Sequence, residues 1–367
     1  MRVLIAGGGT GGHLFPAFAV ARTMRQLHPG VEISWLGGAR GVESRLVPEA
    51  GYPLTLLAAP SLRSSGAGLL ATIRDAAALL WSIPQAIRMI RRIRPHVVFS
   101  TGGFIAIPTL IATWITRTPS LLWEGNVQAG RSTTLVAPLA THRAVAWQRT
   151  TERAPWQGAS TTVTGTPVRE LSVDRHTARV ARGLSEEDQL LLVFGGSQRV
   201  RRFEAALDSA LPTLLKDWSI LHVVMDGLAD AERRRAALPV NLAHRYLPVS
   251  FLAGGEMEAA LVAADLLLGR AGASTIAEAA AAGLPAIIVP YPFAGGHQRA
   301  NAEAAAEAGA ASLVRDEELT SERLIQEIAH YATPAQRAVA ARAATTLARP
   351  NAATATAELL LYLGGQR

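Results

Sequence analysis

The sequence lacks several features that would assign it to common functional classes. It has no cysteine, which excludes disulfides, a thiolate nucleophile and cysteine metal sites, and fits a reducing compartment. No apolar run reaches the ~20 residues of a membrane-spanning helix, and Met1–Ala6 leads into a strand-like segment instead of a signal peptide. The P-loop pattern GxxxxGKS/T is absent, and no closely spaced His, Asp and Glu residues suggest a metal.

What is present indicates a globular chain of two domains. The 367 residues are 49% hydrophobic and 18% charged, which excludes a disordered chain and suits two cores. The net charge of +7 allows nucleic acid, a membrane surface or an anionic substrate as partner. Because the charge is mostly scattered arginine without an aromatic-interleaved basic patch, nucleic-acid binding is the weakest of these hypotheses.

The chain opens with a glycine-rich turn between a predicted strand and a predicted helix. Val3–Ala6 reads as a buried parallel strand, Gly7–Gly12 (GGGTGG) as the turn, and a helix is expected from about Ala17 to Leu27. Such a turn lets the backbone and the helix N-terminus approach a phosphate. A tight structural turn is the alternative, but His13 directly after it favours a functional site.

More strands follow in the first half. Glu32–Leu36 and His96–Ser100 read as strands, the second followed by a glycine turn at Thr101–Gly103. Leu121–Trp123 reads as a strand that ends at Glu124 and Asn126. Ligands bind outside the carboxyl ends of parallel strands, so these polar residues are candidates for binding.

Gly66–Arg94 combines apolar residues such as Leu80 and Trp81 with arginines such as Arg88. We expect Pro84 to prevent a single helix here. Core-packing helices with a solvated face would explain the pattern, and so would a surface that dips into a membrane with its basic residues against anionic headgroups.

The second half repeats the opening architecture. A Pro/Gly turn at Val163–Arg169 places the boundary between a first domain, 1–163, and a second, 164–349. Leu190–Phe194 reads as a strand, Gly195–Gln198 as its glycine turn and Leu221–Met225 as the next strand. Pro350 breaks the helical C-terminal region before a last helix, Ala352–Leu363.

The stretch with the most candidate ligand-binding residues is Gly269–Ala302. It follows the predicted strand 264–268 and contains a helix at Ser274–Ala282, a strand at Ala286–Val289 and a third segment of helical composition. With the glycine turns of both halves, it suggests a nucleotide-linked ligand between two domains. Glu278 suits ribose hydroxyls, and the amides of Gln298 and Asn301 suit sugar hydroxyls.

The motifs as a set resemble the MurG family of UDP-N-acetylglucosamine transferases of bacterial cell-wall synthesis. They run in family order over nearly the whole chain, and the match at 270–302 is the most specific. They are GGGTGGH (Gly7–His13), STGGF (Ser100–Phe104), WEGN (Trp123–Asn126), VTGTPVR (Val163–Arg169), FGGSQ (Phe194–Gln198), RAGASTIAEAAAAGLPAIIVPYP (Arg270–Pro292) and HQRANA (His297–Ala302).

The resemblance implies an α/β GT-B fold, with two Rossmann-like domains of parallel sheet facing a cleft and the last helix returning to the first domain. It implies an inverting, metal-independent transfer without a cofactor, in which UDP-N-acetylglucosamine is a substrate. The implied acceptor is the 4-hydroxyl of undecaprenyl-diphosphate-linked N-acetylmuramoyl-pentapeptide, at the cytoplasmic face of the plasma membrane. The implied partners are these two substrates and an anionic membrane surface, with no nucleic acid.

The resemblance also implies roles for single residues. Thr10, Gly11 and Gly12 would line the cleft by the transferred sugar and the diphosphates, and Asn126 would contact the N-acetylglucosamine. Arg169 and Ser197 would hold the nucleotide, Leu252 would lie by the uracil, and Gln298 would bind the sugar. The UDP would be wrapped by Ala273, Ser274, Thr275, Ile276, Ala277 and Glu278, with Glu278 on the ribose. His13 is the candidate base for the acceptor hydroxyl, with phosphate binding or acceptor positioning as its alternative role.

Several positions depart from the family pattern. Trp123 and Gly125 replace a histidine and a glutamine, Thr166 replaces an asparagine, and Arg199 and Val200 replace Gly-Ala. The segment His222–Gly227 also differs, and the spacing Phe251–Met257 is longer. These changes leave open a transferase that uses a UDP-sugar on another lipid or natural-product acceptor, and a catalytically silent UDP-sugar or membrane-surface binding protein. The matching His13, Asn126, Glu278 and Gln298 argue against the silent protein.

Overall fold

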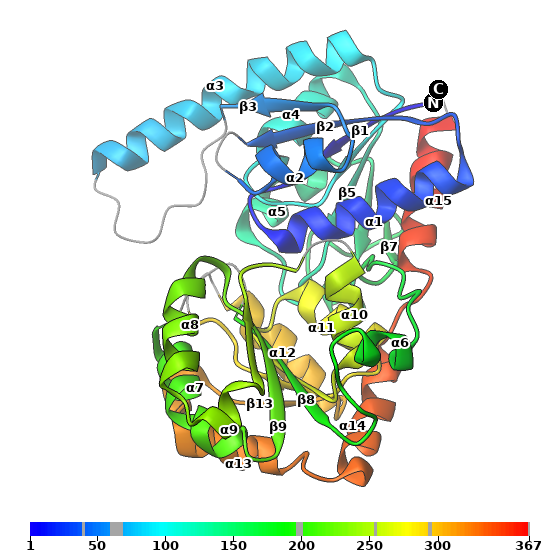
Figure 1. The fold of residues 1–367 in the computed structure, drawn as a ribbon. Coiled ribbons are helices and arrows are strands. Elements are labelled where there is room, and N and C mark those ends of the chain that lie inside the picture. Colours follow the sequence, from blue (N-terminus) through cyan, green and yellow to red (C-terminus); the bar gives the residue numbers. More distant parts are fainter. Residues whose placement is uncertain (39–40, 59–68, 196–200, 253–254, 293–295, 366–367) are drawn as a thin grey trace. The chain divides into compact units, whose positions relative to one another are not determined.

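The computed structural model describes residues 1–38, 41–58, 69–195, 201–252, 255–292 and 296–365 (Figure 1). The chain forms two compact units. Unit 1 is Met1–Val168 together with Arg349–Arg367, and unit 2 is Arg169–Ala348. Each unit is built on its own parallel sheet.

The described residues of unit 1 form a seven-stranded parallel sheet in the order β3-β2-β1-β4-β5-β6-β7. Its strands are β1 (Arg2–Ala6), β2 (Glu32–Gly38), β3 (Leu54–Leu57), β4 (Val97–Ser100), β5 (Ser120–Glu124), β6 (His142–Val145) and β7 (Thr161–Val163). Its helices are α1 (Gly11–Leu27), α2 (Glu43–Glu49), α3 (Leu69–Ile93), α4 (Ala106–Thr116), α5 (Arg131–Val136) and α15 (Ala352–Gly365), with 3-10 turns at Ala137–Leu139 and Gln148–Glu152.

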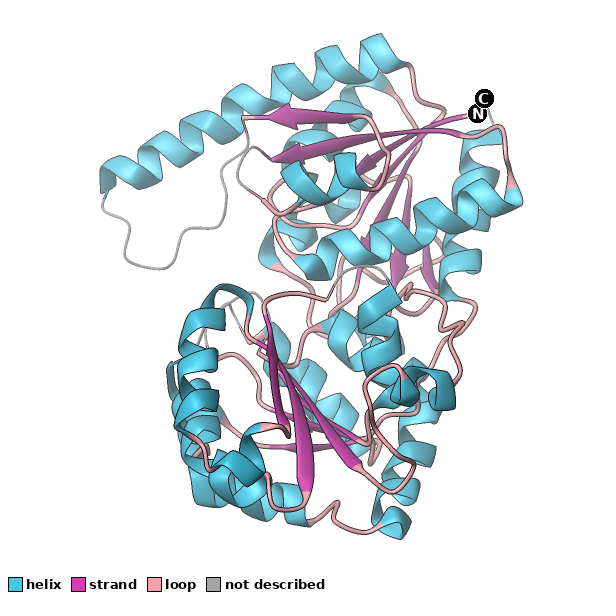
Figure 2. Ribbon diagram, in the orientation of Figure 1, coloured by secondary structure: helices cyan, strands magenta, loops and turns pink. Residues whose placement is uncertain are grey.

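Both faces of this sheet are covered by helices (Figure 2). Val3 and Ile5 of β1 pack with α1 and α15, whereas Leu4 packs on the opposite face with Ala86 and Ile90 of α3. Burial on both faces explains why β1 reads as a continuous apolar run and not as an alternating one.

The described residues of unit 2 form a six-stranded parallel sheet in the order β10-β9-β8-β11-β12-β13. Its strands are β8 (Gln189–Phe194), β9 (Trp218–Val223), β10 (Tyr246–Val249), β11 (Leu266–Gly269), β12 (Ala286–Ile288) and β13 (Ala311–Leu313). Its helices are α6 (Arg175–Val180), α7 (Arg201–Leu214), α8 (Leu228–Ala237), α9 (Val240–Ala243), α10 (Gly255–Ala263), α11 (Ala273–Ala281), α12 (His297–Glu307), α13 (Ser321–Ala329) and α14 (Pro334–Leu347), with 3-10 turns at Met225–Gly227 and Asp316–Glu318.

The strand order reverses next to the first strand of each sheet. The chain builds β1, β2 and β3 outward and then returns to β4 on the other side of β1, and β11 lies beside β8 in the same way. In open parallel sheets the crevice for a ligand lies at such a switch point, outside the carboxyl ends of the strands. Each unit therefore has one expected ligand-binding site, at its switch point.

The predicted break of the helix at Pro84 is wrong. Helix α3 runs unbroken from Leu69 to Ile93 with Pro84 inside it, as the long cyan helix of Figure 1 shows. A proline in a helix costs about 3 kcal/mol. Burial of Ala86 and Ile90 in the core and packing of α3 along α4 offset that cost, since each large apolar side chain that is buried contributes about 1.5–3 kcal/mol.

Two predicted boundaries also need correction. Helix α1 begins at Gly11, not near Ala17, because the Thr10 carbonyl already accepts from the N–H groups of His13 and Leu14, each over 3.2 Å. Strand β9 ends at Val223, two residues before the predicted end. Met225 has a φ of +51°, a left-handed conformation that no strand contains.

Candidate functional site

In unit 1 the glycine-rich turn lies at the first switch point, directly after β1. The Trp35 indole donates to the Gly7 carbonyl over 2.8 Å. A Cβ at Gly7 would lie only 2.4 Å from Thr101 Oγ1, which follows β4. Close approach of the β1 and β4 ends therefore requires glycine at this position.

His13 lies in the first turn of α1 and faces the residues after β4. Its Nδ1 lies 2.6 Å from the Thr101 carbonyl oxygen. A carbonyl can only accept, so Nδ1 carries the proton and, in the neutral ring, Nε2 keeps its lone pair. The tertiary contact thus selects the tautomer that can accept a proton at Nε2.

The glycine turn after β4 makes room for this ring. A Cβ on Gly102 would lie 3.4 Å from His13 Cε1, and one on Gly103 would lie 3.4 Å from His13 Cδ2. Both glycines have positive φ, +92° and +75°, where side chains are disfavoured. The STGGF motif therefore seats the His13 imidazole.

Asn126 follows β5 and is held by a buried carboxylate. Glu124 is 3% exposed. Its Oε1 accepts from the Asn126 backbone N–H over 2.9 Å and from Asn126 Nδ2 over 2.8 Å, and its Oε2 accepts from Gly130 N–H over 3.1 Å. The Trp147 indole donates to the Gly125 carbonyl over 3.1 Å. The loop that presents Asn126 is therefore fixed from two sides.

The residues predicted to lie near the diphosphates are at the start of α1. Thr10 is its N-cap residue, with extended backbone, and Gly11 and Gly12 form its first turn. Together with His13 they lie at the carboxyl end of β1, and Asn126 lies at the carboxyl end of β5, two strands away along the same edge. Unit 1 thus gathers its candidate residues along one edge of its sheet.

In unit 2 the switch point carries α11, directly after β11. The sequence predicted this helix to within one residue at each end. Ser274, Thr275, Ala277 and Glu278 are half-buried, whereas Ala273 and Ile276 are buried. The helix therefore presents polar residues on one face and packs the other into the core.

Arg169 and Glu278, 109 residues apart in the chain, form an ion pair. Arg169 Nε donates to Glu278 Oε1 over 3.1 Å, and the two side chains are 21% and 14% exposed. Burial raises the pKa of the Glu278 carboxyl, and Arg169 opposes this shift. The two residues assigned to the nucleotide therefore belong to one polar group.

The other predicted residues of unit 2 are spread along the same sheet edge. Gln298 Oε1 accepts from the Tyr291 backbone N–H over 2.9 Å, which places its amide at the start of α12. Leu252 is 9% exposed and follows β10, the outermost strand. Two strands, β9 and β8, lie between β10 and β11. Ser197 lies outside the described residues.

Asn301 and Arg270 make buried contacts that hold neighbouring elements together at this end of the sheet. Asn301 is fully buried and its Nδ2 donates to the Ala271 carbonyl over 3.1 Å. Arg270 pairs with Asp316 over 2.7 Å and lies 5.0 Å from the centre of the Phe203 ring. These contacts hold the end of β11 against α12 and α7.

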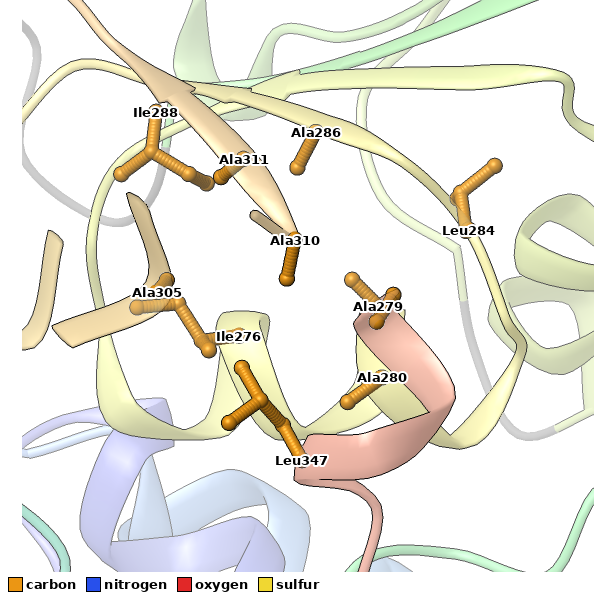
Figure 3. Close-up of a pocket in the computed structure, with 11 residues that line it drawn as sticks. Ile276, Ala279, Ala280, Leu284, Ala286, Ile288, Ala305, Ala310, Ala311 and Leu347 are labelled. Atoms are coloured by element: carbon orange, nitrogen blue, oxygen red, sulfur yellow. The ribbon is translucent and has the colours of Figure 1, made fainter. Parts of the chain in front are cut away.

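An apolar pocket lies behind α11 and is not the candidate site. Figure 3 shows Ile276, Ala280 and Leu347 pointing into it. All of its lining side chains are apolar, so it offers no hydrogen-bonding side chain to a nucleotide. It is a packing gap between helices α11, α12 and α14 and strands β12 and β13.

Sequence reasoning missed three residues that build these sites. Glu43, Thr101 and Thr133 are all buried, and Thr133 Oγ1 would lie 3.4 Å from a Cβ on Gly102. Thr101 belongs to a recognised motif, but no local pattern marks Glu43 or Thr133, because the contacts of Glu43 with Gly9 and of Thr133 with Gly102 join distant segments.

Two family models together match most of the chain. Residues 3–145 match the glycosyltransferase family 28 N-terminal domain, and residues 190–357 match the glycosyltransferase family 28 C-terminal domain. The chain belongs to glycosyltransferase family 28. In keeping with that family, it carries two Rossmann-like units in the GT-B arrangement of elements.

Similar curated proteins share one name. A relative from Moorella thermoacetica is 37% identical, covering 98% of each chain, and one from Nitrosococcus oceani is 39% identical, also covering 98% of each. Both are named UDP-N-acetylglucosamine–N-acetylmuramyl-(pentapeptide) pyrophosphoryl-undecaprenol N-acetylglucosamine transferase.

Solved structures agree with the family assignment. The crystal structure of Acinetobacter baumannii MurG aligns with a TM-score of 0.73 and 27% identity, covering 98% of this chain and 99% of that one. The calicheamicin glycosyltransferase CalG4 aligns with a TM-score of 0.71 over 99% of this chain and 98% of that one at 14% identity, which shows a shared fold alone.

The departures from the family motifs lie mostly in the interior. The Trp123 side chain is 1% exposed, and its indole donates to the Gly165 carbonyl over 3.1 Å. Thr166 is buried, and His222 is buried against the Tyr246 hydroxyl at 2.9 Å. Arg199 and Val200 lie outside the described residues. The departures in the described ranges therefore alter core packing more than exposed surface.

Proposed function

We propose that this protein transfers N-acetylglucosamine from UDP-N-acetylglucosamine to the 4-hydroxyl of undecaprenyl-diphosphate-linked N-acetylmuramoyl-pentapeptide. One observation carries the proposal: relatives named for this reaction are similar over 98% of the chain. Two groups of residues, around His13 in unit 1 and around Glu278 in unit 2, supply the chemistry that the reaction needs.

The acceptor hydroxyl must lose its proton as it attacks, and His13 is the proposed base. In the proposed inverting step, the muramoyl oxygen forms a bond to the anomeric carbon while the bond from that carbon to the UDP oxygen breaks. The proton passes to His13 Nε2, because Nδ1 already carries a proton, which it donates to the Thr101 carbonyl. A positioned base contributes about 10²–10⁴-fold to such a step.

The leaving UDP gathers negative charge, and the proposed nucleotide site is the start of α11. Backbone N–H groups at a helix N-terminus and the helix dipole favour a phosphate. Arg169 lies beside this helix through its contact with Glu278 and would offset the developing charge. Glu278 would accept from ribose hydroxyls, Gln298 would bind the sugar and Leu252 would lie by the uracil.

The proposed reaction uses UDP-N-acetylglucosamine as a substrate and no cofactor or metal, as the family resemblance implies. The polar groups named above would supply the stabilisation of charge. Turnover in the presence of a chelator tests this part of the proposal, and loss of activity that added metal restores would overturn it.

We further propose that unit 1 works on the cytoplasmic face of the plasma membrane, against anionic lipid. On α3, Leu80 and Trp81 are 68% and 66% exposed, and Arg74 and Arg88 lie seven residues either side of Trp81, on its face of the helix. Helix α4, which packs along α3, also carries an exposed tryptophan, Trp114. None of the described helices is long and apolar enough to cross a bilayer. Apolar side chains flanked by arginine suit the headgroup region.

One incubation tests the reaction. The purified chain is mixed with UDP-N-acetylglucosamine and a lipid-diphosphate muramoyl-pentapeptide analogue, and UDP release and product mass are followed. A product heavier by one N-acetylglucosamine residue is the expected result. Binding of UDP-sugar without transfer to this acceptor would overturn the assignment and favour another acceptor.

A further inference from the structure

A buried carboxylate lies beneath the glycine-rich turn of unit 1. Glu43, the first residue of α2, is 1% exposed. Its Oε2 accepts from Gly9 N–H over 2.8 Å, and its Oε1 accepts from Gly38 N–H over 2.8 Å. One side chain therefore ties the turn after β1 to the end of β2.

The surrounding glycines are shaped around this carboxylate. A Cβ on Gly8 would lie 2.3 Å from Glu43 Cδ, one on Gly37 would lie 2.7 Å from Glu43 Cγ, and one on Gly41 would lie 1.9 Å from Glu43 Oε2. Each of these distances is shorter than any real carbon contact allows. Glycines from two segments, the turn after β1 and the stretch from the end of β2 to α2, thus form a cradle that the Glu43 carboxylate fills.

This contact changes what the turn can bind. In a nucleotide-binding glycine loop, backbone N–H groups point at a phosphate. Here Gly9 N–H already donates to a carboxylate, and a second anion beside it would be repelled. The Glu43 carboxylate therefore occupies the N–H group of the turn at Gly9. A phosphate would bind further along the turn, at Thr10–Gly12.

The same contact sets the start of α1. Thr10, the residue after Gly9, has the carbonyl that accepts from the N–H groups of His13 and Leu14 over 3.2 Å. Holding Gly9 therefore fixes the residue from which α1, with His13 in its first turn, begins.

We propose that Glu43 is a positioning residue for the acceptor substrate. It packs against Gly8 and Gly9 of the glycine-rich turn and holds Thr10–Gly12 and His13 where they meet the acceptor's diphosphate and hydroxyl. This inference rests on the proposed function, since it assigns Glu43 to the acceptor and not to the UDP-sugar.

The test is Glu43→Gln in the full chain. Glutamine keeps the shape but has one accepting oxygen, and its NH₂ would face an N–H group. Loss of one charge-assisted hydrogen bond predicts a rise of about 10-fold or more in the acceptor KM, and misplacement of His13 predicts a lower kcat. The KM for UDP-N-acetylglucosamine should stay within about twofold, because the nucleotide residues lie in unit 2.

Glu49→Gln is the matched control, since Glu49 is exposed on the same helix. Amide hydrogen exchange of a peptide covering residues 7–14 gives a readout that needs no activity: exchange should be faster in E43Q than in E49Q, with the peptides of unit 2 unchanged. If E43Q does not fold, E43D, which is one methylene too short to reach both N–H groups, replaces it with the same expectations.

Unchanged acceptor kinetics, equal losses for both substrates or unchanged exchange at residues 7–14 would each overturn the proposal. If the wild-type chain makes no product from the lipid-linked acceptor, the proposed function fails instead. The exchange comparison then still decides whether Glu43 holds the turn.

Discussion

Arg169 Nε donates to Glu278 Oε1 over 3.1 Å, and this contact joins the first residues of unit 2 to α11. Both residues were expected to meet the nucleotide, one as a cation and one as a hydroxyl acceptor. Their pairing keeps the carboxylate from being a buried charge without a partner, which would be costly. Arg169 is thereby held beside α11, the helix whose N-terminus is proposed to bind UDP.

Glu278→Ala should weaken binding of UDP and UDP-N-acetylglucosamine by about 10–100-fold, the scale of lost hydrogen bonds to a charged group. Isothermal titration with UDP measures this directly. Glu303→Ala is the control, because the Glu303 side chain on α12 is 45% exposed and pairs along its own helix with Arg299. Equal affinity of the Glu278 variant and wild type would remove Glu278 from the nucleotide site.

His13→Ala should lower turnover by about 10²-fold or more, the scale of general-base catalysis. UDP affinity should be retained, since the nucleotide residues lie in unit 2. Steady-state UDP release and titration with UDP separate the two effects. His28→Ala, at an exposed position just after α1, should behave as wild type. Near-normal turnover of His13→Ala would exclude His13 as the base.

Changing Leu80 and Trp81 together to serine should reduce binding to vesicles that contain anionic lipid. The substitution removes two exposed apolar side chains from the proposed membrane surface and keeps its arginines. Co-sedimentation with vesicles measures the bound fraction. Val240→Ser, at a position that is 91% exposed on α9 of unit 2, is the control. Equal sedimentation of the double variant and wild type would contradict the membrane assignment.

Unfolding temperature should rise with pH between about 3 and 6.5 in a way that depends on His222. Burial, with a smaller contribution from Arg234, lowers the pKa of His222 to about 3, below the ordinary value near 6.5. In that interval the unfolded chain binds a proton that the folded chain does not, so stability is lost as pH falls.

His222→Gln should flatten this dependence over the same interval, whatever its effect on stability at neutral pH. Thermal unfolding at several pH values measures the slope. His330→Gln, at an exposed position, should keep the wild-type slope. A slope unchanged in the His222 variant would show that other groups cause the acid sensitivity.

Local patterns in the sequence were enough to predict the α/β class, the strands that open each half, helix α11 and the family, because these depend on local apolar runs, glycine turns and contiguous motifs. Sequence reasoning failed where distant segments decide the outcome. Pro84 stays within α3 because packing offsets its local cost. Strand β9 ends at Val223 because Val224 has helical and Met225 left-handed backbone, which no residue type in that segment predicts.

Which atoms come into contact follows from the tertiary fold and could not be predicted from the sequence. The sequence names His13, but the Thr101 carbonyl, 88 residues away, selects its tautomer. It names Arg169 and Glu278 separately, and folding pairs them. It gives no sign that Glu43 meets the glycine-rich turn, because pairing of β1 with β2 brings Gly8 and Gly9 to Glu43. Motifs record residue types along the chain, whereas hydrogen bonds and burial depend on neighbours that the order of strands supplies.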